Sequence, residues 1–345
     1  MSSPRFCYIV MCHTDREGLA RALRRIRELS PQAQIVVRPD GPGLVTSQLL
    51  AEVGATAVDS DVRITWGGWS MMQAELEVLE HVHGTVDVDH VVLVSGQDYP
   101  IRDLAQWEAQ VRATGADALV DVYPPMEEDW QYRWWSVQPP RLGPRIARRT
   151  VKWGWRRVAP AVHGAVLFYQ GRRDSRWALG VRRAELVRGR PPVTVIKGSQ
   201  WLTMSSRALD SVLRRHREDP AVRAFFERTR ISDESYVQSL LLADASLRVM
   251  DCPTTFARFR YDEWSPTWLD LDELALAART PAAFARKLPA DVDDAVVAEA
   301  DRLCARRGDE VPAIEEAVPG EVKLTGAERA PGLAPVATGL AAARG

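Results

Sequence analysis

The stretch VVLVSGQDYP, residues 91–100, decides the fold class of this chain. Its first four residues are all apolar, which is typical of a strand buried on both faces of a parallel sheet. The polar run that follows ends the strand. Gly96 supplies backbone freedom and Pro100 stops the strand, so a simple turn is one interpretation of SGQDYP. The other interpretation is that Gln97 and Asp98 enter a ligand site, and the pattern alone leaves both open.

Predicted strands alternate with predicted helices from this stretch back to the N-terminus. FCYIVM (6–11) is a second apolar run and QIVV (34–37) is a third. Between the strands, apolar residues recur three or four positions apart, as on one face of a helix. They are Leu19, Leu23, Ile26 and Leu29; Leu49, Leu50 and Val53; and Met71, Leu76 and Leu79, which follow WGGWS (66–70). This alternation predicts an α/β fold with a mostly parallel, doubly wound central sheet flanked by helices.

The second half of the chain predicts further regular structure. VTVIKGSQWLTMS (193–205) predicts a strand that runs through a Gly-Ser-Gln-Trp interruption, and a helix follows over 206–217. Two more helices end near Arg307. We therefore predict one domain over residues 1–308. Residues 309–345 are rich in Ala, Pro and Gly with little periodicity, which predicts a disordered tail.

Ligands of doubly wound sheets bind at the carboxyl ends of the strands. Five residues follow the predicted strands directly: Cys12, His13, Asp40, Gln97 and Asp98. We expect them to face one crevice.

The segment 121–190 differs in composition from the rest. It holds six of the twelve tryptophans, and from 141 to 190 it has 14 Lys and Arg against two acidic residues. We interpret it as an insertion on the acceptor side. If helical, it would present a basic stripe, and two interpretations stay open: solvated charges, or a peripheral hold on an anionic membrane surface or lipid-linked acceptor.

Composition and missing motifs exclude several classes. The net charge is −1, so no overall field draws the chain to nucleic acid, and the four cysteines have no disulfide or zinc spacing. The chain lacks a GxxxxGK[ST] loop, a GxGxxG turn and an HExxH pair. No window of 18 apolar residues occurs, and the first apolar run is too short for a signal peptide. These features predict a cytoplasmic protein, with peripheral contact at the inner membrane face left open.

One acidic residue lies where a catalytic base could be placed. ISDESYVQSLLL (231–242) predicts a helix with Ser232 as N-cap and an apolar stripe that includes Val237 and Leu241. Glu234 falls in its first turn, where the helix N-terminus would favour the anion that a general base needs. The alternative, a first-turn Glu that only complements the helix dipole, stays open.

Two cations and three acidic pairs bear on diphosphate binding. Arg260 in FRYDEW and Lys287 in FARKLP could neutralise a departing diphosphate, although a lone cation is normally at the surface. Asp-x-Asp pairs, which often hold a metal in sugar transferases, occur at 59/61, 87/89 and 270/272. We interpret all three as solvated acidic turns, so no metal site is predicted.

Taken in order, these motifs resemble glycosyltransferase family 14, the core-2/I-branching N-acetylglucosaminyltransferases and peptide O-xylosyltransferases. The matching pieces are CYIVMCHTD (7–15), WGGWSMMQAELEVLE (66–80), LVSGQDYPIRD (93–103), KGSQWLTMSSRAL (197–209), SDESYVQSLL (232–241), FRYDEW (259–264) and FARKL (284–288). The animal enzymes have membrane anchors and many disulfides, which this chain lacks, so it looks like a bacterial member.

The resemblance implies a GT-A-like fold and an inverting, metal-independent transfer of a sugar, GlcNAc or xylose, from UDP to an acceptor hydroxyl. It assigns site residues by motif position: Glu234 as base; Arg260 and Lys287 on the diphosphate; Val10, Cys12, Asp40 and Asp98 on the nucleotide; and Gln97, Gln200 and Trp201 toward the acceptor or sugar. No cofactor is implied.

The chain also departs from the family pattern. Branching enzymes have a histidine where Cys12 aligns, and EEDWQYRWW (127–135) only loosely matches their charged acceptor motif. The acceptor, whether a glycan, glycolipid, peptide or small molecule, therefore stays open. Two other classes remain: a metal-dependent transferase or nucleotidyltransferase, and a catalytically inactive glycan-binding domain.

Overall fold

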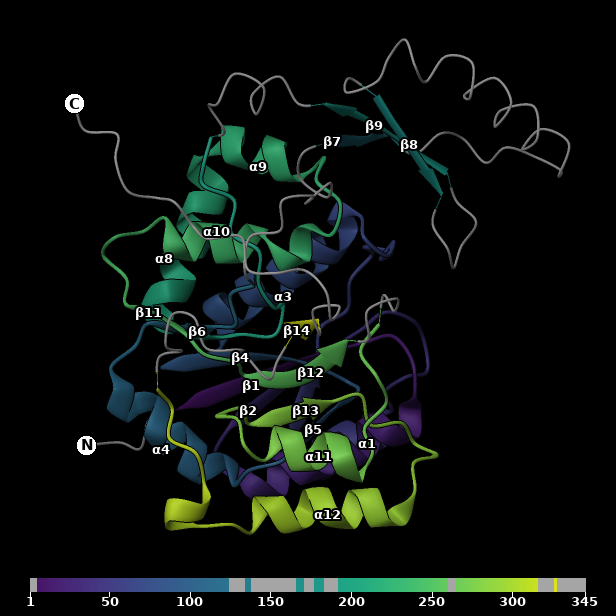
Figure 1. Cartoon of the computed structure of the whole chain (residues 1–345), viewed down its shortest axis with the longest axis vertical. Helices are drawn as coiled ribbons and strands as arrows, with labels where there is room; N and C mark the ends of the chain where they lie inside the picture. Colours follow the sequence, from purple (N-terminus) through teal and green to yellow (C-terminus); the bar gives the residue numbers. More distant parts are fainter. Residues whose placement is uncertain are drawn as a thin grey trace, which may run out of the picture.

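The central sheet is built as the alternation of strands and helices predicts (Figure 1). The computed structural model describes residues 5–123, 134–137, 166–170, 177–182, 192–259, 265–315 and 326–327. Seven strands form the sheet in the order β11-β6-β10-β4-β1-β2-β3. Their bounds are β1 (Phe6–Cys12), β2 (Gln34–Pro39), β3 (Ala55–Ala57), β4 (His90–Ser95), β6 (Ala118–Val120), β10 (Thr203–Ser205) and β11 (Val249–Asp251). Neighbours pair in parallel except at β10, which is antiparallel to both β4 and β6.

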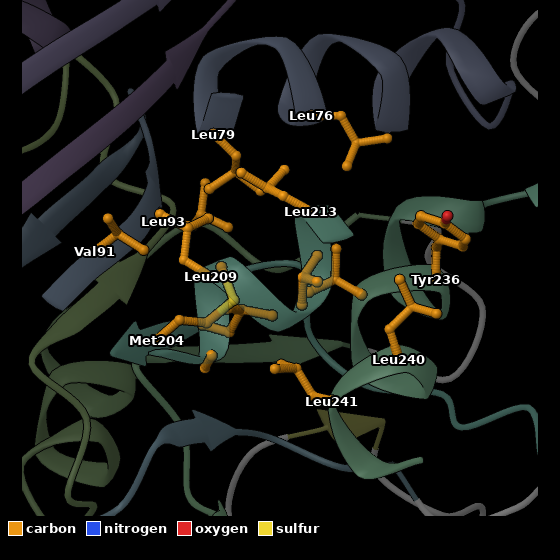
Figure 2. Packing of buried hydrophobic residues seen from close by; sticks show 14 of the residues in the cluster. Leu76, Leu79, Val91, Leu93, Met204, Leu209, Leu213, Tyr236, Leu240 and Leu241 are labelled. Carbon is orange, nitrogen blue, oxygen red and sulfur yellow. The ribbon is translucent and has the colours of Figure 1, made fainter. Parts of the chain in front are cut away.

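Helices cover both faces of this sheet (Figure 1). One face carries α3 (Trp69–Thr85), α8 (Ser206–Glu218), α9 (Pro220–Phe226) and α10 (Tyr236–Leu242); the other carries α1 (Arg16–Leu29), α2 (Ser47–Val53) and α4 (Leu104–Thr114). Because side chains alternate along a strand, Val91 and Leu93 pack toward the first set and Val92 and Val94 toward the second. Figure 2 shows Leu93 among the leucines of α3 and α8.

A second sheet joins residues that are far apart in sequence. It has the order β14-β12-β13-β5, with β5 (Asp98–Pro100), β12 (Thr255–Phe259), β13 (Phe284–Arg286) and β14 (Gly326–Ala327). It shares an apolar cluster with α11 (Leu271–Ala277) and α12 (Asp294–Cys304). A 3₁₀ turn over Gly308–Glu310 follows. A third, antiparallel sheet has the order β7-β9-β8, formed by β7 (Trp134–Val137), β8 (Val166–Gln170) and β9 (Trp177–Arg182).

The structure confirms the fold class and corrects three local predictions. SGQDYP is not only a turn, because its DYP is strand β5, paired with β13. The strand predicted over 193–205 is confined to Thr203–Ser205, since Gly198 makes an isolated bridge with Val122 instead of continuing a ladder. Ser232 does not cap α10. It begins the 3₁₀ turn η2 (Ser232–Glu234), and Ser235 is the residue that precedes the helix. Glu234 therefore lies in η2, ahead of α10, and not in the first turn of the helix as predicted.

Several predictions fall where the structure gives no account. The basic stripe over 145–156, most of the 121–190 insertion and most of the 309–345 tail lie outside the described residues. The four cysteines are all buried. Among the described helices, none has the length and apolarity needed to cross a membrane.

Candidate active site

Three parallel strands deliver their carboxyl ends to one edge of the central sheet. Backbone hydrogen bonds fix their relative heights: the Asp40 N–H donates to the Cys12 carbonyl at 2.7 Å, and the Gly96 N–H donates to the Met11 carbonyl at 2.8 Å. The strands are packed tightly here, because a Cβ on Gly96 would lie 2.6 Å from the Cys12 Cβ. The strand ends are therefore closely packed at the position where parallel sheets bind ligands.

The side chains of Val10 and Cys12 lie below this edge rather than on it. Both belong to the apolar cluster under α1, and burial raises the pKa of Cys12 to about 12. A ligand at this point would meet their backbone or the exposed His13 beside them. The Asp40 carboxylate accepts from Arg38 Nη1 at 3.0 Å and is partly exposed. The nucleotide contacts assigned to these residues stay predictions.

Pairing of β5 with β13 brings two further cations to the edge. Asp98 lies opposite Arg286 in the ladder, and its Oδ1 is 3.3 Å from Arg286 Nε, an ion pair without hydrogen-bond alignment. Burial raises the pKa of Asp98 and the charge of Arg286 opposes the rise. The Arg286 guanidinium also lies over the Trp201 ring, 4.7 Å from its centroid. Asp98 and Arg286 thus form an ion pair across the two strands.

Lys287 extends this cationic edge by one residue. Its Nζ donates to Ser265 Oγ at 2.7 Å and lies 5.8 Å from the centroid of the Trp268 ring. The Leu288 N–H donates to the Gln97 carbonyl at 3.0 Å, which ties the FARKL segment to the end of β4. Partial desolvation of the His13 ring and the charge of Lys287 lower the pKa of His13. Lys287 therefore lies within electrostatic reach of the end of β1.

Glu234 reaches the same edge through the loop at 197–201. The Gly198 N–H donates to the Glu234 carbonyl at 2.9 Å, and Lys197 Nζ lies 3.7 Å from Glu234 Oε2. Both side chains keep part of their surface exposed, 16% for Lys197 and 29% for Glu234. A general base needs solvent and substrate access of this kind.

Glu234 and Arg286 both lie close enough to the Tyr123 side chain for their charges to affect its pKa. Burial raises the pKa of Tyr123 well above its ordinary value, the charges of Asp121 and Glu234 add to the rise, and the charge of Arg286 opposes it. Arg286 adjoins Lys287 in the chain. The structure thus gathers the predicted base and one of the two predicted diphosphate cations, Lys287, at one edge. The other, Arg260, lies outside the described residues.

Two buried carboxyl groups, those of Asp233 and Glu75, lie near Glu234. Glu75 of α3 has no exposed surface, and its Oε2 accepts from Gln200 Nε2 at 2.9 Å. Burial raises the pKa of Asp233, and the charge of Glu234 adds to the rise. Gln238 Nε2 donates to both the Ser199 carbonyl and the Asp233 carbonyl, at 2.8 and 3.0 Å. Polar contacts therefore join the 197–201 loop to η2.

Gly198 fills a position that has no room for a side chain. A Cβ there would lie 2.6 Å from the Asp121 carbonyl oxygen, which belongs to the backbone after β6. Gly198→Ala is therefore expected to destabilise the fold by about 1–3 kcal/mol and to move Lys197 away from Glu234. Differential scanning calorimetry measures the first effect. The control is Gly84→Ala, because a Cβ at Gly84 meets nothing within 4 Å, and an unchanged Tm for Gly198→Ala would contradict the packing argument.

Two of the three acidic pairs considered for metal binding make structural contacts, and the third, Asp59 and Asp61, flanks Ser60, which accepts from Arg38 beside Asp40. Asp270 caps α11 by accepting from the Glu273 N–H at 2.8 Å, and Asp87 and Asp89 contact Arg5. In the described part of the chain, no group of three or more His, Cys, Asp or Glu side chains is placed to hold a metal ion.

A family model named Core-2/I-Branching enzyme matches residues 46–276, about two thirds of the chain. The chain belongs to the Core-2/I-branching enzyme family. This is a glycosyltransferase family, so the chain is a glycosyltransferase that acts on a sugar donor and an acceptor. The matched range contains Asp98, Gln200 and Glu234, whereas β1 and the FARKL segment lie outside it.

The other comparisons give a distant match or none. No curated protein matches this chain. A solved structure described as a glucose-1-phosphate thymidylyltransferase from Bacillus anthracis, in complex with a sucrose, matches with 10% identity and a TM-score of 0.31, covering 71% of this chain and 85% of that one. At that score the likeness carries no argument.

Sequence reasoning missed four residues of this edge: Glu75, Lys197, Asp233 and Arg286. Each stands inside or beside a motif used for another residue, Arg286 next to Lys287 and Lys197 at the start of KGSQW. Arg286 is identified only by the register of DYP against FAR in the folded sheet, which pairs it with Asp98.

Proposed function

We propose that this chain is an inverting, metal-independent glycosyltransferase that moves GlcNAc or xylose from UDP to an acceptor hydroxyl. One observation carries the proposal. Glu234, which pairs with Lys197, lies at the same edge of the sheet as the cations Arg286 and Lys287. Base-assisted attack and stabilisation of a departing diphosphate need these two kinds of group close together.

The proposed reaction is a single in-line displacement. The Glu234 carboxylate takes the proton of the acceptor hydroxyl as its oxygen attacks the anomeric carbon. The bond from that carbon to the β-phosphate oxygen breaks on the opposite face, so the configuration inverts. UDP leaves with the bonding electrons, and Lys287, together with Arg260 as the family motif assigns, stabilises its negative charge. Arg286, paired with Asp98, adds positive charge to the same edge.

The test is a UDP-release screen over a panel of UDP-sugars in excess EDTA, with and without simple glycan acceptors. Release with UDP-GlcNAc or UDP-xylose that EDTA leaves unchanged is the expected result. Activity that vanishes in EDTA and returns with Mn²⁺ would contradict metal independence and favour a metal-dependent transferase. Binding of UDP-sugars without UDP release would instead support an inactive glycan-binding domain.

A further inference from the structure

Glu75 is a buried acid that the proposed reaction does not use. It lies in the middle of α3 with no exposed surface, and in the described structure it forms no ion pair. Its Oε2 accepts from Gln200 Nε2, and its Oε1 has no hydrogen-bond partner. Burial raises the pKa of Glu75 to about 8, against the hydrogen bond from Gln200, and the charge of Asp233 adds to the rise. Near neutral pH the group is therefore mostly an uncharged carboxylic acid.

The contact that Glu75 makes supports the loop beside Glu234. Gly198 and Ser199 are tied to Glu234 and Gln238 by the hydrogen bonds described above. Gln200 is tied to Glu75, and its only other described acceptor is the weak Met11 sulfur at 3.9 Å. The next residue, Trp201, supports the Arg286 guanidinium. This side-chain hydrogen bond is one of the contacts that hold the end of the loop, together with those from the Trp201 N–H to Ser199 Oγ and from the Leu93 N–H to the Leu202 carbonyl.

We propose that Glu75 is a positioning residue for sugar transfer, which in its neutral form holds Gln200 so that Trp201 and Lys197 lie correctly at the site. The proposal rests on the proposed function in placing the 197–201 loop beside the transfer site. When Glu75 ionises, a buried negative charge forms close to Asp233, and none of the cations that the structure describes forms an ion pair with it. The loop is then expected to loosen and the rate to fall.

The charged groups around Glu75 are few. From η2, Asp233 acts on it directly, and Asp233 in turn feels Glu234 and Lys197. From α8, Arg217 and Asp210 reach Glu80 and His83, which lie more than one turn further along α3. The side contributed by β1 is apolar at Met11.

The test compares Glu75→Gln with Glu75→Leu in UDP release from UDP-GlcNAc and UDP-xylose. The glutamine carbonyl still accepts from Gln200, whereas leucine leaves that amide without an acceptor. We expect Glu75→Leu to lower kcat by about 10- to 100-fold, and Glu75→Gln to stay several-fold above it. The wild-type rate should fall above about pH 8, and Glu75→Gln should lack this alkaline limb. Equal kcat values for both variants, or an alkaline limb kept in Glu75→Gln, would overturn the proposal.

A second measurement needs no turnover. The folded state binds more protons than the unfolded state between pH 4.5 and about 8, so the contribution of Glu75 to stability falls as pH rises through that window. The Tm of Glu75→Gln should therefore rise relative to wild type from pH 5 to pH 8, and a constant difference would overturn the proposal. If Glu75→Leu fails to fold, Gln200→Ala breaks the same contact from the loop side and should lower kcat similarly. Glu234→Gln separates the two ideas, because its activity tests the base and not Glu75.

Discussion

Replacing Glu234 by glutamine is expected to slow sugar transfer by about 10²- to 10⁴-fold. Glutamine has nearly the same shape but cannot take a proton from the acceptor hydroxyl. The backbone carbonyl that accepts from Gly198 is unchanged, and the side chain is partly exposed, so the fold should persist. Steady-state UDP release measures the rate, and the thermal unfolding curve of the same sample checks the fold.

Asp233→Asn is the matched comparison, because the two acids are neighbours in one turn. Asp233 is buried, and burial raises its pKa, so it is less available as an ionised base at neutral pH. We expect its loss of activity to be smaller than that of Glu234→Gln. Wild-type transfer by Glu234→Gln, or a larger loss in Asp233→Asn, would move the role of base away from Glu234.

The central sheet could be predicted because its signal is local. Each of β1, β2 and β4 is a run of apolar residues buried on both faces, and the helices between them carry their apolar stripes at helical spacing. The carboxyl-end rule then selects His13, Asp40 and Gln97 from the sequence alone. All three lie at the edge to which the structure also brings Glu234.

The contacts that complete the site could not be predicted from local patterns. Asp98 and Arg286 are 188 positions apart, and only the pairing of β5 with β13 makes them neighbours. Glu75 occupies a helix position whose surroundings are set by the 197–201 loop, which the sequence suggested was a strand. Ser232 failed as a helix cap because η2 intervenes, and a 3₁₀ turn has no distinct apolar period over three residues.

Lys287→Met is expected to lower kcat/KM by about 10²- to 10³-fold, the range found when one fixed donor to a developing negative charge is removed. Methionine keeps most of the side-chain length but not the ammonium group. That group is held by Ser265 Oγ and its charge acts on His13 and Asp98, which places it at the end of β1 and β4. Isothermal titration should show weaker binding of UDP and unchanged binding of uridine, because only UDP carries the diphosphate.

Arg279→Met removes the same charge from an exposed position at the end of α11 and is the control for net charge. Its UDP affinity should match wild type. Weaker binding of uridine and UDP alike in Lys287→Met would show that Lys287 shapes the nucleotide site rather than neutralising phosphate. Recovery of the Lys287→Met rate by Mn²⁺ would support the assignment, because an added cation would then perform the role that we assign to the fixed ammonium group. The two substitutions therefore test separate roles. Glu234→Gln removes the group that accepts the acceptor proton, and Lys287→Met removes a positive charge that stabilises the departing diphosphate.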